Sequence, residues 1–386
     1  MANTVVRIGL VMTHTLGFYR QILRRVKTFA VERPNWVFSP IAPDKRAIEM
    51  ALPLRCDGYL AHIFTQPLAQ SLLALRKPVV SVAGVMSDLP LPHVMVDHPE
   101  VGRQAARHML ERGVRQFGYV GYPKHEFSVE RERGFREVVV SAGYSVASFH
   151  ERTQRVQDPT GMWNWNKPLM TWLNGLSKPI GILASNDVQG AQVSEYCRQL
   201  GLRVPDEIAI VGVDNDDLLC ELSRPSLSSV ALAGERIGFE AAGLLDKWLR
   251  GSPPGNSVVV LPPAGVVVRQ SSDLLAVPDP RVSAALRFIR EHADQPIQVR
   301  DVLQEVPVAR RALERRFRKW LQRSISEEIH RVHLERSRQL LVQTDMSLAA
   351  VALGSGFRDG RQLSVAYRRE MGLTPSAFRR QYRLRS

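Results

Sequence analysis

Side chains suited to hydrogen bonding stand at the ends of apolar segments that lie far apart in the chain. Asp97, Asp187 and Asp214 each follow such a segment, and Arg131 lies in the stretch after another. Carboxylate, amide and guanidinium groups suit a neutral ligand with many hydroxyls, because each hydroxyl both donates and accepts a hydrogen bond. Helix capping is the alternative role of Asp97 and Asp187, because each precedes a predicted helix. The sequence therefore predicts a polyhydroxylated ligand and leaves capping open for single residues.

A second group of residues suits a polyanion. Residues 281–386 contain 22 basic and 11 acidic residues, out of 52 and 38 in the whole chain. All but one of these basic residues are arginines, which bind phosphate oxygens and guanine edges through paired hydrogen bonds. A basic terminal region attached to a body that is close to neutral predicts an anionic polymer as partner.

Motifs for other chemistry are missing from the sequence. It contains no GxxxxGK[ST] loop, no GxGxxG after a strand, no HExxH and no GxSxG. Cys56, Cys197 and Cys220 are far apart and form no CxxC pair, so we expect buried free thiols in a reducing compartment. We therefore expect no enzymatic activity, no metal and no cofactor.

Two pairs of residues carry weaker signals. His330 and His333 lie three apart on a predicted helix, where we expect a solvated face and keep a shared metal as the alternative. Trp163 and Trp165 either stack on a sugar or, as we favour, pack against the edge of a lobe.

The start of the chain and its hydropathy indicate a compartment. The first residues lack a basic region followed by a long apolar core, and no run of about 18 apolar residues occurs in the chain. We therefore expect a cytoplasmic protein that makes no contact with a membrane.

Strands and helices must alternate to position the first group of residues. Residues 5–12 form a nearly continuous apolar run, typical of a strand buried on both faces, and a helical pattern follows over 18–32. Further strands are predicted over 36–41, 57–63, 78–83, 93–97, 116–121, 179–184 and 207–213. Further helices are predicted over 67–76, 99–112, 128–142, 187–200 and 232–250. This alternation predicts parallel sheets with helices on both faces, and the length of the region favours two lobes.

Ligands of parallel sheets bind beyond the carboxyl ends of the strands, so these ends define the candidate binding residues. The residues at these ends are Thr13, His14, Thr15, Phe18, Tyr19, Arg20, Asp97, Tyr122, Arg131, Ser185, Asn186, Asp187, Asp214 and Asn215.

The basic region contains one pattern twice. Residues 271–280 carry two prolines and are predicted to be a linker. The apolar positions of the first copy are Val299, Val302, Val308, Leu313 and Phe317, and those of the second are Leu348, Val351, Phe357, Leu363 and Tyr367. Each copy predicts a helix, a turn and a second helix, the layout of a helix-turn-helix unit, although two unrelated hairpins are the alternative. The predicted helix over 325–344 would span roughly 30 Å. One turn of DNA is about 34 Å, so this helix could set the two units into successive major grooves.

Three motifs of the body carry a resemblance. SNDVQG (185–190), AIVGVDND (209–216) and SVERERGF (128–135) resemble the effector-binding core of the lactose-repressor and periplasmic-sugar-binding-protein superfamily. The resemblance covers roughly residues 5–270 and implies that Arg131, Asp187 and Asp214 bind sugar hydroxyls. Chains of the lactose-repressor type begin with a helix-turn-helix, whereas this chain starts directly at the first strand, so we expect DNA binding elsewhere.

The segment 347–383 carries a second resemblance, to the AraC family of transcription activators, through Gly356-Phe357 and Gly372-Leu373-Thr374-Pro375. This resemblance covers about 281–383. The DNA-contacting positions that it implies are Arg311, Glu314 and Arg315 in the first recognition helix, and Gly360, Arg361, Gln362 and Val365 in the second. Ala309 stands where the family often has a capping Ser, and Gly360 is expected to weaken its helix by up to ~1 kcal/mol.

The order of the two regions resembles that of xylose-operon regulators along nearly the whole chain. This implies a two-lobed α/β sensor like periplasmic binding proteins over 1–272, a linker over 273–280 and an all-α domain with two helix-turn-helix units over 281–386. The pocket positions that it implies are Thr13, Tyr19, Arg20, Asp97, Arg131, Asp187 and Asp214. Thr13-His14-Thr15 departs from the pattern of that family, which leaves the sugar open.

We expect a sugar-responsive, sequence-specific DNA-binding transcription regulator, an activator of pentose (xylose) catabolism genes. The implied partners are double-stranded DNA, a small sugar such as D-xylose, a second copy of the chain in a homodimer, and RNA polymerase. A repressor or a regulator of the same architecture for another sugar is the alternative. A sugar-modifying enzyme and a sugar transport protein are the rivals from other classes.

Overall fold

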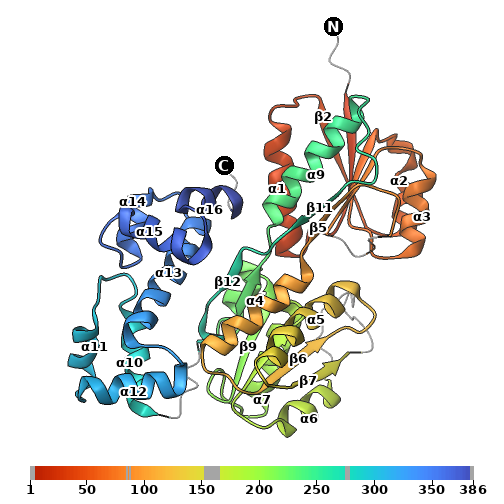
Figure 1. Cartoon of the computed structure of the whole chain (residues 1–386). Coiled ribbons are helices and arrows are strands. Elements are labelled where there is room, and N and C mark those ends of the chain that lie inside the picture. The colour runs from red at the N-terminus through yellow and green to blue at the C-terminus, as the bar shows by residue number, and fades with distance from the viewer. Residues whose placement is uncertain (1–4, 84–85, 87, 152–165, 274–278, 383–386) are drawn as a thin grey trace.

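Apolar strands build the first of two parallel sheets. The computed structural model describes residues 5–83, 86, 88–151, 166–273 and 279–382 (Figure 1). In sheet order the strands of the first lobe are β11 (Val258–Leu261), β5 (His93–Val96), β4 (Val79–Val82), β3 (Gly58–Ala61), β1 (Val6–Val11) and β2 (Trp36–Ile41). Helices α1 (Gly17–Ala30) and α9 (Gly234–Leu249) cover one face, and α2 (Lys45–Ala51), the short 3-10 turn η1 (Leu52–Leu54) and α3 (Gln66–Ala74) lie at the other. All of these strands pair in parallel, as predicted.

The second lobe repeats this design. In sheet order its strands are β12 (Gly265–Val267), β10 (Ser228–Ala231), β9 (Ile208–Asp214), β8 (Ile180–Ala184), β6 (Phe117–Gly121) and β7 (Val146–His150), and only β12 is antiparallel to its neighbour among the described strands. The helices of this lobe are α4 (His98–Glu111), α5 (Glu126–Ser141), α6 (Lys167–Gly175), α7 (Asp187–Gln199) and α8 (Asp217–Leu222). The chain passes between the lobes after β5, after β10 and after β11, so the expected two-lobed α/β fold is confirmed.

The terminal domain is all helical and contains both predicted helix-turn-helix units. After the 3-10 turn η2 (Gln270–Ser272), its helices are α10 (Pro280–Glu291), α11 (Val299–Glu305), α12 (Arg310–Leu321), α13 (Ile325–Gln343), α14 (Leu348–Gly354), α15 (Gly360–Met371) and α16 (Pro375–Tyr382). Each unit has a hydrophobic core of its own, and α13 contributes Ile325 and Ile329 to the first and Leu334 and Leu341 to the second. The long helix therefore joins the two units, as its length predicted.

His330 and His333 do not lie on a solvated face, so that expectation was wrong. Both rings pack edge-on against Phe357, with centroid separations of 6.0 and 5.9 Å. Burial lowers the pKa of both imidazoles, that of His333 to about 4. Gly356 has φ +75° and leaves no space for a Cβ beside the His333 ring. The pair therefore packs the second unit against α13.

The remaining predictions about the chain as a whole have mixed outcomes. The three cysteines are buried and free, as expected. Within the described ranges, no helix combines the length and the apolar character needed to cross a bilayer. Trp163 and Trp165 lie outside the described residues.

Candidate functional site

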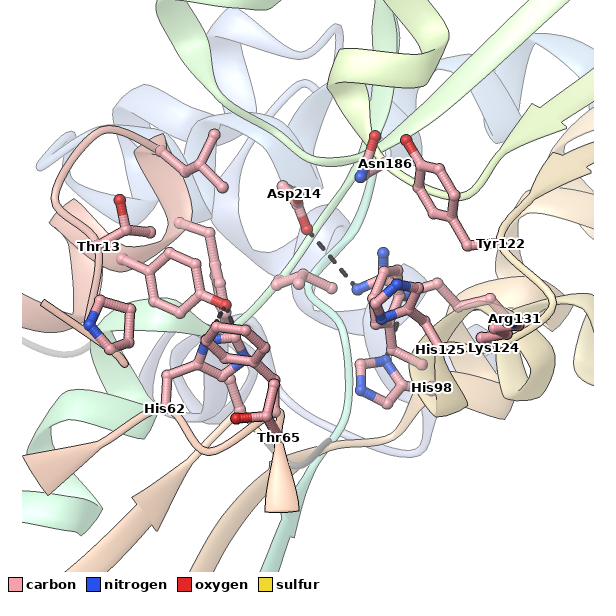
Figure 2. A pocket seen from close by; sticks show the side chains of 18 of the residues that line it. Thr13, His62, Thr65, His98, Tyr122, Lys124, His125, Arg131, Asn186 and Asp214 are labelled. Atoms are coloured by element: carbon pink, nitrogen blue, oxygen red, sulfur yellow. Dashed lines mark hydrogen bonds and ion pairs between the residues drawn. The ribbon is translucent and has the colours of Figure 1, made fainter. Parts of the chain in front are cut away.

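A cavity of about 450 Å³ opens between the two lobes, within the usual range for a small-molecule site. Figure 2 shows side chains from both lobes pointing into it. The first lobe contributes Thr13, Thr15, Leu16, Phe18, Tyr19, Pro43, His62, Phe64, Thr65 and Ala83. The second contributes His98, Tyr122, Pro123, Lys124, His125, Phe127, Arg131, Glu151, Asn186 and Asp214, and Leu232 lies in the connection between the lobes. The described polar residues are therefore brought together from many elements, as parallel sheets require.

An ion pair stands at the centre of the second lobe's wall. Arg131 on α5 lies 3.7 Å from the Asp214 carboxylate at the end of β9, and both are joined by a dashed line in Figure 2. The Arg131 guanidinium also donates to the Ser185 carbonyl and, over 3.3 Å, to Nδ1 of His98. Its face lies over the Phe127 ring at 5.0 Å. These contacts fix the guanidinium, so that it presents donors to a ligand at low conformational cost.

Burial controls the charge of this pair. Burial is the largest influence on the pKa of Asp214 and raises it to about 6. The charge of Arg131 lowers this pKa, and the charge of Asp216 raises it. Burial lowers the pKa of Arg131, and the negative charge of Asp214 opposes that shift. Asp214 has φ +111°, a strained conformation for a non-glycine residue. At neutral pH the site therefore presents an ionised carboxylate beside a guanidinium.

The first lobe faces this pair with a neutral one. The Tyr19 hydroxyl lies 2.9 Å from the His62 imidazole, and Tyr19 is buried. Burial raises the pKa of Tyr19 and lowers that of His62 to about 4. An uncharged imidazole carries one donor and one acceptor, so the pair offers hydrogen bonds of either sense to a hydroxyl.

Three of the seven predicted pocket residues lie outside the lining. Arg20 donates to the Thr15 carbonyl over 2.6 Å and lies 3.4 Å from Asp216, which belongs to the other lobe. Asp97 accepts from the Glu100 amide at 2.9 Å and so caps α4, the alternative role that the sequence left open. The other four, Thr13, Tyr19, Arg131 and Asp214, line the cavity.

Asp187 is buried behind the cavity rather than in its wall. Its carboxylate accepts from the Asp216 amide at 2.8 Å and from the Ser229 hydroxyl at 2.5 Å. Burial, followed by the charge of Asp214, raises its pKa to about 8. Its contacts therefore hold the Asp214–Asp216 loop in place, and the capping role that the sequence left open belongs to its neighbour Asn186, which accepts from the Gln189 amide.

Several lining residues escaped the sequence analysis. His62, Phe64 and Thr65 follow β3, which ends at Ala61 and not at Ile63 as predicted. Glu151 follows β7, a strand that was not predicted, and its carboxylate is held by Asn166 at 2.7 Å. The same rule of strand ends would have found these residues, had the ends been placed correctly.

The two recognition helices present most of the predicted DNA-contacting residues to solvent. Arg311 and Arg315 are exposed on α12, four residues apart and therefore on one face. Arg361, Gln362 and Val365 are exposed on α15. Gln362 also folds back, because its side-chain oxygen accepts from the Arg358 amide at 2.9 Å.

One detail of these helices differs from expectation, and it concerns Gly360. The Glu314 carboxylate accepts from the Ile325 amide at 3.3 Å, beside the capping box that Ser324 and Glu327 form at the start of α13, and its contact with bases stays a prediction. Gly360 is the first residue of α15 and Asp359 caps that helix by accepting from Gln362 at 2.7 Å. The cost of an interior glycine therefore does not apply to Gly360. The start of α12 lacks a side-chain cap at Ala309, as predicted.

Comparison with known proteins agrees with both halves of the chain. Residues 83–272 match the periplasmic binding protein-like domain, and residues 302–381 match a helix-turn-helix domain. The xylose operon regulatory protein of Escherichia coli K12 is 29% identical over 97% of this chain and 96% of its own length. That of Haemophilus influenzae Rd is 30% identical over 84% of this chain and 85% of its own. A solved structure of the xylose-binding transcription activator xylR aligns with a TM-score of 0.63 at 27% identity, over 98% of this chain and 99% of the other.

A ligand cavity between two lobes, followed by paired DNA-binding units, defines a sugar-responsive transcription regulator and not an enzyme. The chain belongs to the family of xylose operon regulatory proteins.

Proposed function

We propose that D-xylose binds in the cavity between the lobes and that this chain, as a homodimer, then activates genes of pentose catabolism. The names of its relatives support the sugar and the operon. The observation that carries the proposal is the convergence of the Arg131–Asp214 pair and the Tyr19–His62 pair on one cavity. Together they offer charged and neutral groups to the several hydroxyls of a sugar.

The chemistry of the wall fits a sugar in a second way. Phe18, Phe64, Phe127 and Tyr122 line the cavity between the polar groups. Aromatic rings pack against the C–H faces of a sugar, while the polar groups bind its hydroxyls. The proposed ligand-binding set therefore consists of Thr13, Tyr19, Arg131 and Asp214 from the prediction, with His62 and Asn186 added.

Closure of the two lobes on the sugar changes the way in which the DNA-binding domains are presented. The sugar drives this change only if it binds one arrangement of the lobes more tightly than the other. Two copies of the domain in a homodimer then bind two sites on the duplex, and the bound activator recruits RNA polymerase. A cytoplasmic location belongs to this proposal, since the DNA lies there.

A thermal-shift screen against pentoses, hexoses and polyols tests the sugar. A ligand at 100 times its dissociation constant stabilises the native state by about 2.7 kcal/mol, so D-xylose should raise the melting temperature more than the other sugars. Asp214→Ala should abolish the shift, because it removes an acceptor and leaves Arg131 without its counter-charge. Asp206→Ala is the matched control, since Asp206 is an exposed carboxylate of the same lobe.

The outcomes of the screen are distinct. If another sugar raises the melting temperature and D-xylose does not, that sugar is the effector and the protein remains a sugar-responsive regulator. An unchanged shift in Asp214→Ala would remove Asp214 from the binding set.

A further inference from the structure

Helix α4 joins the ligand cavity to the DNA-binding domain. Its first residue, His98, lines the cavity and accepts from Arg131. Its last residue, Glu111, lies against the terminal domain. Fourteen residues span about 21 Å at 1.5 Å per residue. Figure 1 shows this helix running from the junction of the lobes toward α12 and α13.

Helix α4 and the helix that carries Arg131 are packed too closely to slide past each other. A Cβ atom at Gly102 of α4 would overlap the Arg131 carbonyl, and one at Gly134 of α5 would overlap the Pro99 carbonyl. Two backbones in such contact move together, because close-packed interiors transmit displacement. A ligand that engages Arg131 therefore acts on α4 as well.

The far end of α4 is bound to the first helix-turn-helix unit by charged groups. Arg323, in the turn between α12 and α13, donates to the Glu111 carbonyl over 2.8 Å. Arg331 of α13 lies 3.4 Å from the Glu111 carboxylate. Arg115, just beyond α4, donates to the carbonyl of Trp320 in α12 over 3.3 Å. Both arginines of the terminal domain are also held by Glu328, whose side chain is almost fully buried.

Charge balance holds the arginines of this junction in place. Burial alone would raise the pKa of Glu328 and lower that of Arg331, but their mutual attraction reverses both shifts. The buried Glu328 pairs, which lie within the terminal domain, are costly to break, because each partner would be left as an uncompensated charge. Across the junction, Arg331 meets Glu111 and Arg290 of α10 meets Asp273, which follows η2 of the second lobe, and both of these carboxylates are half-exposed.

Among the described residues, the second unit faces α4 across a cavity of about 480 Å³, which Gln104 and Arg107 of α4 line together with Glu370, Met371 and Phe378 of the second unit. The contacts named above all reach the first unit or the first half of α13. Because Glu111, Arg115 and Asp273 belong to the second lobe, the first unit is fastened to that lobe.

We propose that α4 and α5 form a lever that carries ligand binding at Arg131 to the first helix-turn-helix unit through Glu111 and Arg115. This inference rests on the proposed function. When the lobes close, the second lobe and the first unit turn as one body relative to the first lobe. Glu111 and Arg115 are positioning residues, since they touch neither sugar nor DNA.

The test changes the sensor side only, in the full-length protein. The double variant Glu111→Ala, Arg115→Ala loses both side-chain contacts of the lever, the Arg331 ion pair and the bond to Trp320. It keeps every residue of the DNA-binding domain, the bond from Arg323 to the backbone carbonyl of residue 111 and the Arg290–Asp273 pair. Glu137→Ala is the control, because Glu137 is an exposed carboxylate on α5 whose ion pair with Arg103 of α4 lies away from the domain junction. DNA affinity is measured with and without D-xylose, and sugar affinity by calorimetry.

Wild type and Glu137→Ala should show a sugar-dependent change in DNA affinity of about fivefold or more, whereas the double variant should come within about twofold of no change. Its sugar affinity should match that of the wild type in the absence of DNA, which shows that the pocket is intact. A double variant that keeps the wild-type change overturns the lever. If no sugar changes the DNA affinity of the wild type, the proposed function itself is wrong.

Discussion

Asp187 and Asp214 show how two carboxylates at neighbouring strand ends acquire different roles. Asp214 stands in the cavity wall beside Arg131, whereas Asp187 lies behind it and accepts from the Asp216 amide and the Ser229 hydroxyl. Burial raises the pKa of both, and for Asp187 the charge of Asp214 raises it further. Only Asp214 is therefore placed to exchange hydrogen bonds with a ligand.

Sugar binding should depend on pH through Asp214. Its pKa is raised to about 6, first by burial, so it is protonated below that value and ionised above it. The ionised carboxylate accepts more hydrogen bonds, and sugar affinity should therefore fall as the pH is lowered from about 7.5 to about 5. Calorimetry at both values measures this change.

Asp214→Asn supplies the comparison for this prediction. The variant should bind more weakly at neutral pH and lose most of the pH dependence, leaving the contributions of His125, which also lines the cavity, and of Asp187 behind it, whose pKa is raised to about 8. Equal slopes for wild type and variant would contradict the assignment of the titration to Asp214.

The residues of the site were predictable where a strand end was placed correctly. Thr13, Tyr19, Arg131 and Asp214 were found in this way. Asp97 and Asp187 were not separable from them by sequence, because a carboxylate after a strand serves equally well as a helix cap or as a loop anchor. Which role it takes depends on backbone amides that only the folded loop brings near.

At the scale of elements, α12 and α15 occupy equivalent places in the two units and differ in chemistry. Exposed residues of α12 include Arg311 and Arg315, whereas α15 presents Arg361, Gln362 and the apolar Val365. Arginine pairs with guanine, glutamine with adenine, and an apolar side chain contacts the thymine methyl group. The two helices should therefore read different sequences.

Single substitutions should separate the two readings. Arg315→Ala and Arg361→Ala should each relax preference at a different half of one asymmetric site, by about 1–3 kcal/mol per lost base contact, with the halves about one turn apart. Binding-site selection with each variant measures this. Arg318→Ala is the control, since Arg318 is exposed near the end of α12 and should at most weaken all sequences alike. If both variants change the preference at the same base pairs, the two helices do not bind in separate major grooves.

Arg379 stands near the end of α16, where an exposed arginine would contact phosphate at most. Its guanidinium instead donates to the carbonyls of Leu341 and Met346, over 3.3 and 2.7 Å, and ties α16 to the end of α13. It is therefore unsuited as a surface control.

Most of the strands were predictable, whereas β7, β10, β11 and β12 were not. The long helices and the buried strands of both sheets have strong periodicity or continuous apolar runs. Strands β10, β11 and β12 contain three or four residues each and are about as short as β3, β4 and β5, which were predicted, so length alone does not explain the difference. Ser228 of β10, for example, is buried because it bonds to the backbone of Arg269, a contact that periodicity does not reveal.

At the scale of the molecule, a polar contact beside the cavity ties the two lobes together. Asp216 of the second lobe accepts from the amide of Gly17 at 2.6 Å, at the start of α1 in the first lobe, and lies 3.4 Å from Arg20. A side chain at position 17 would collide with the Asp216 carboxylate. Such a contact depends on the angle between the lobes, and so does the placement of the DNA-binding domain fastened to the second lobe.

The central claim is that sugar and DNA binding are coupled in one molecule. Coupling between two sites is reciprocal, because each ligand changes the affinity of the other by the same factor. The measurement is the dissociation constant of a DNA site selected by the full-length protein, with and without saturating D-xylose, together with that of D-xylose with and without the DNA. We predict equal factors of about fivefold or more in both directions. Tight binding of both ligands with no effect of either on the other would contradict the account.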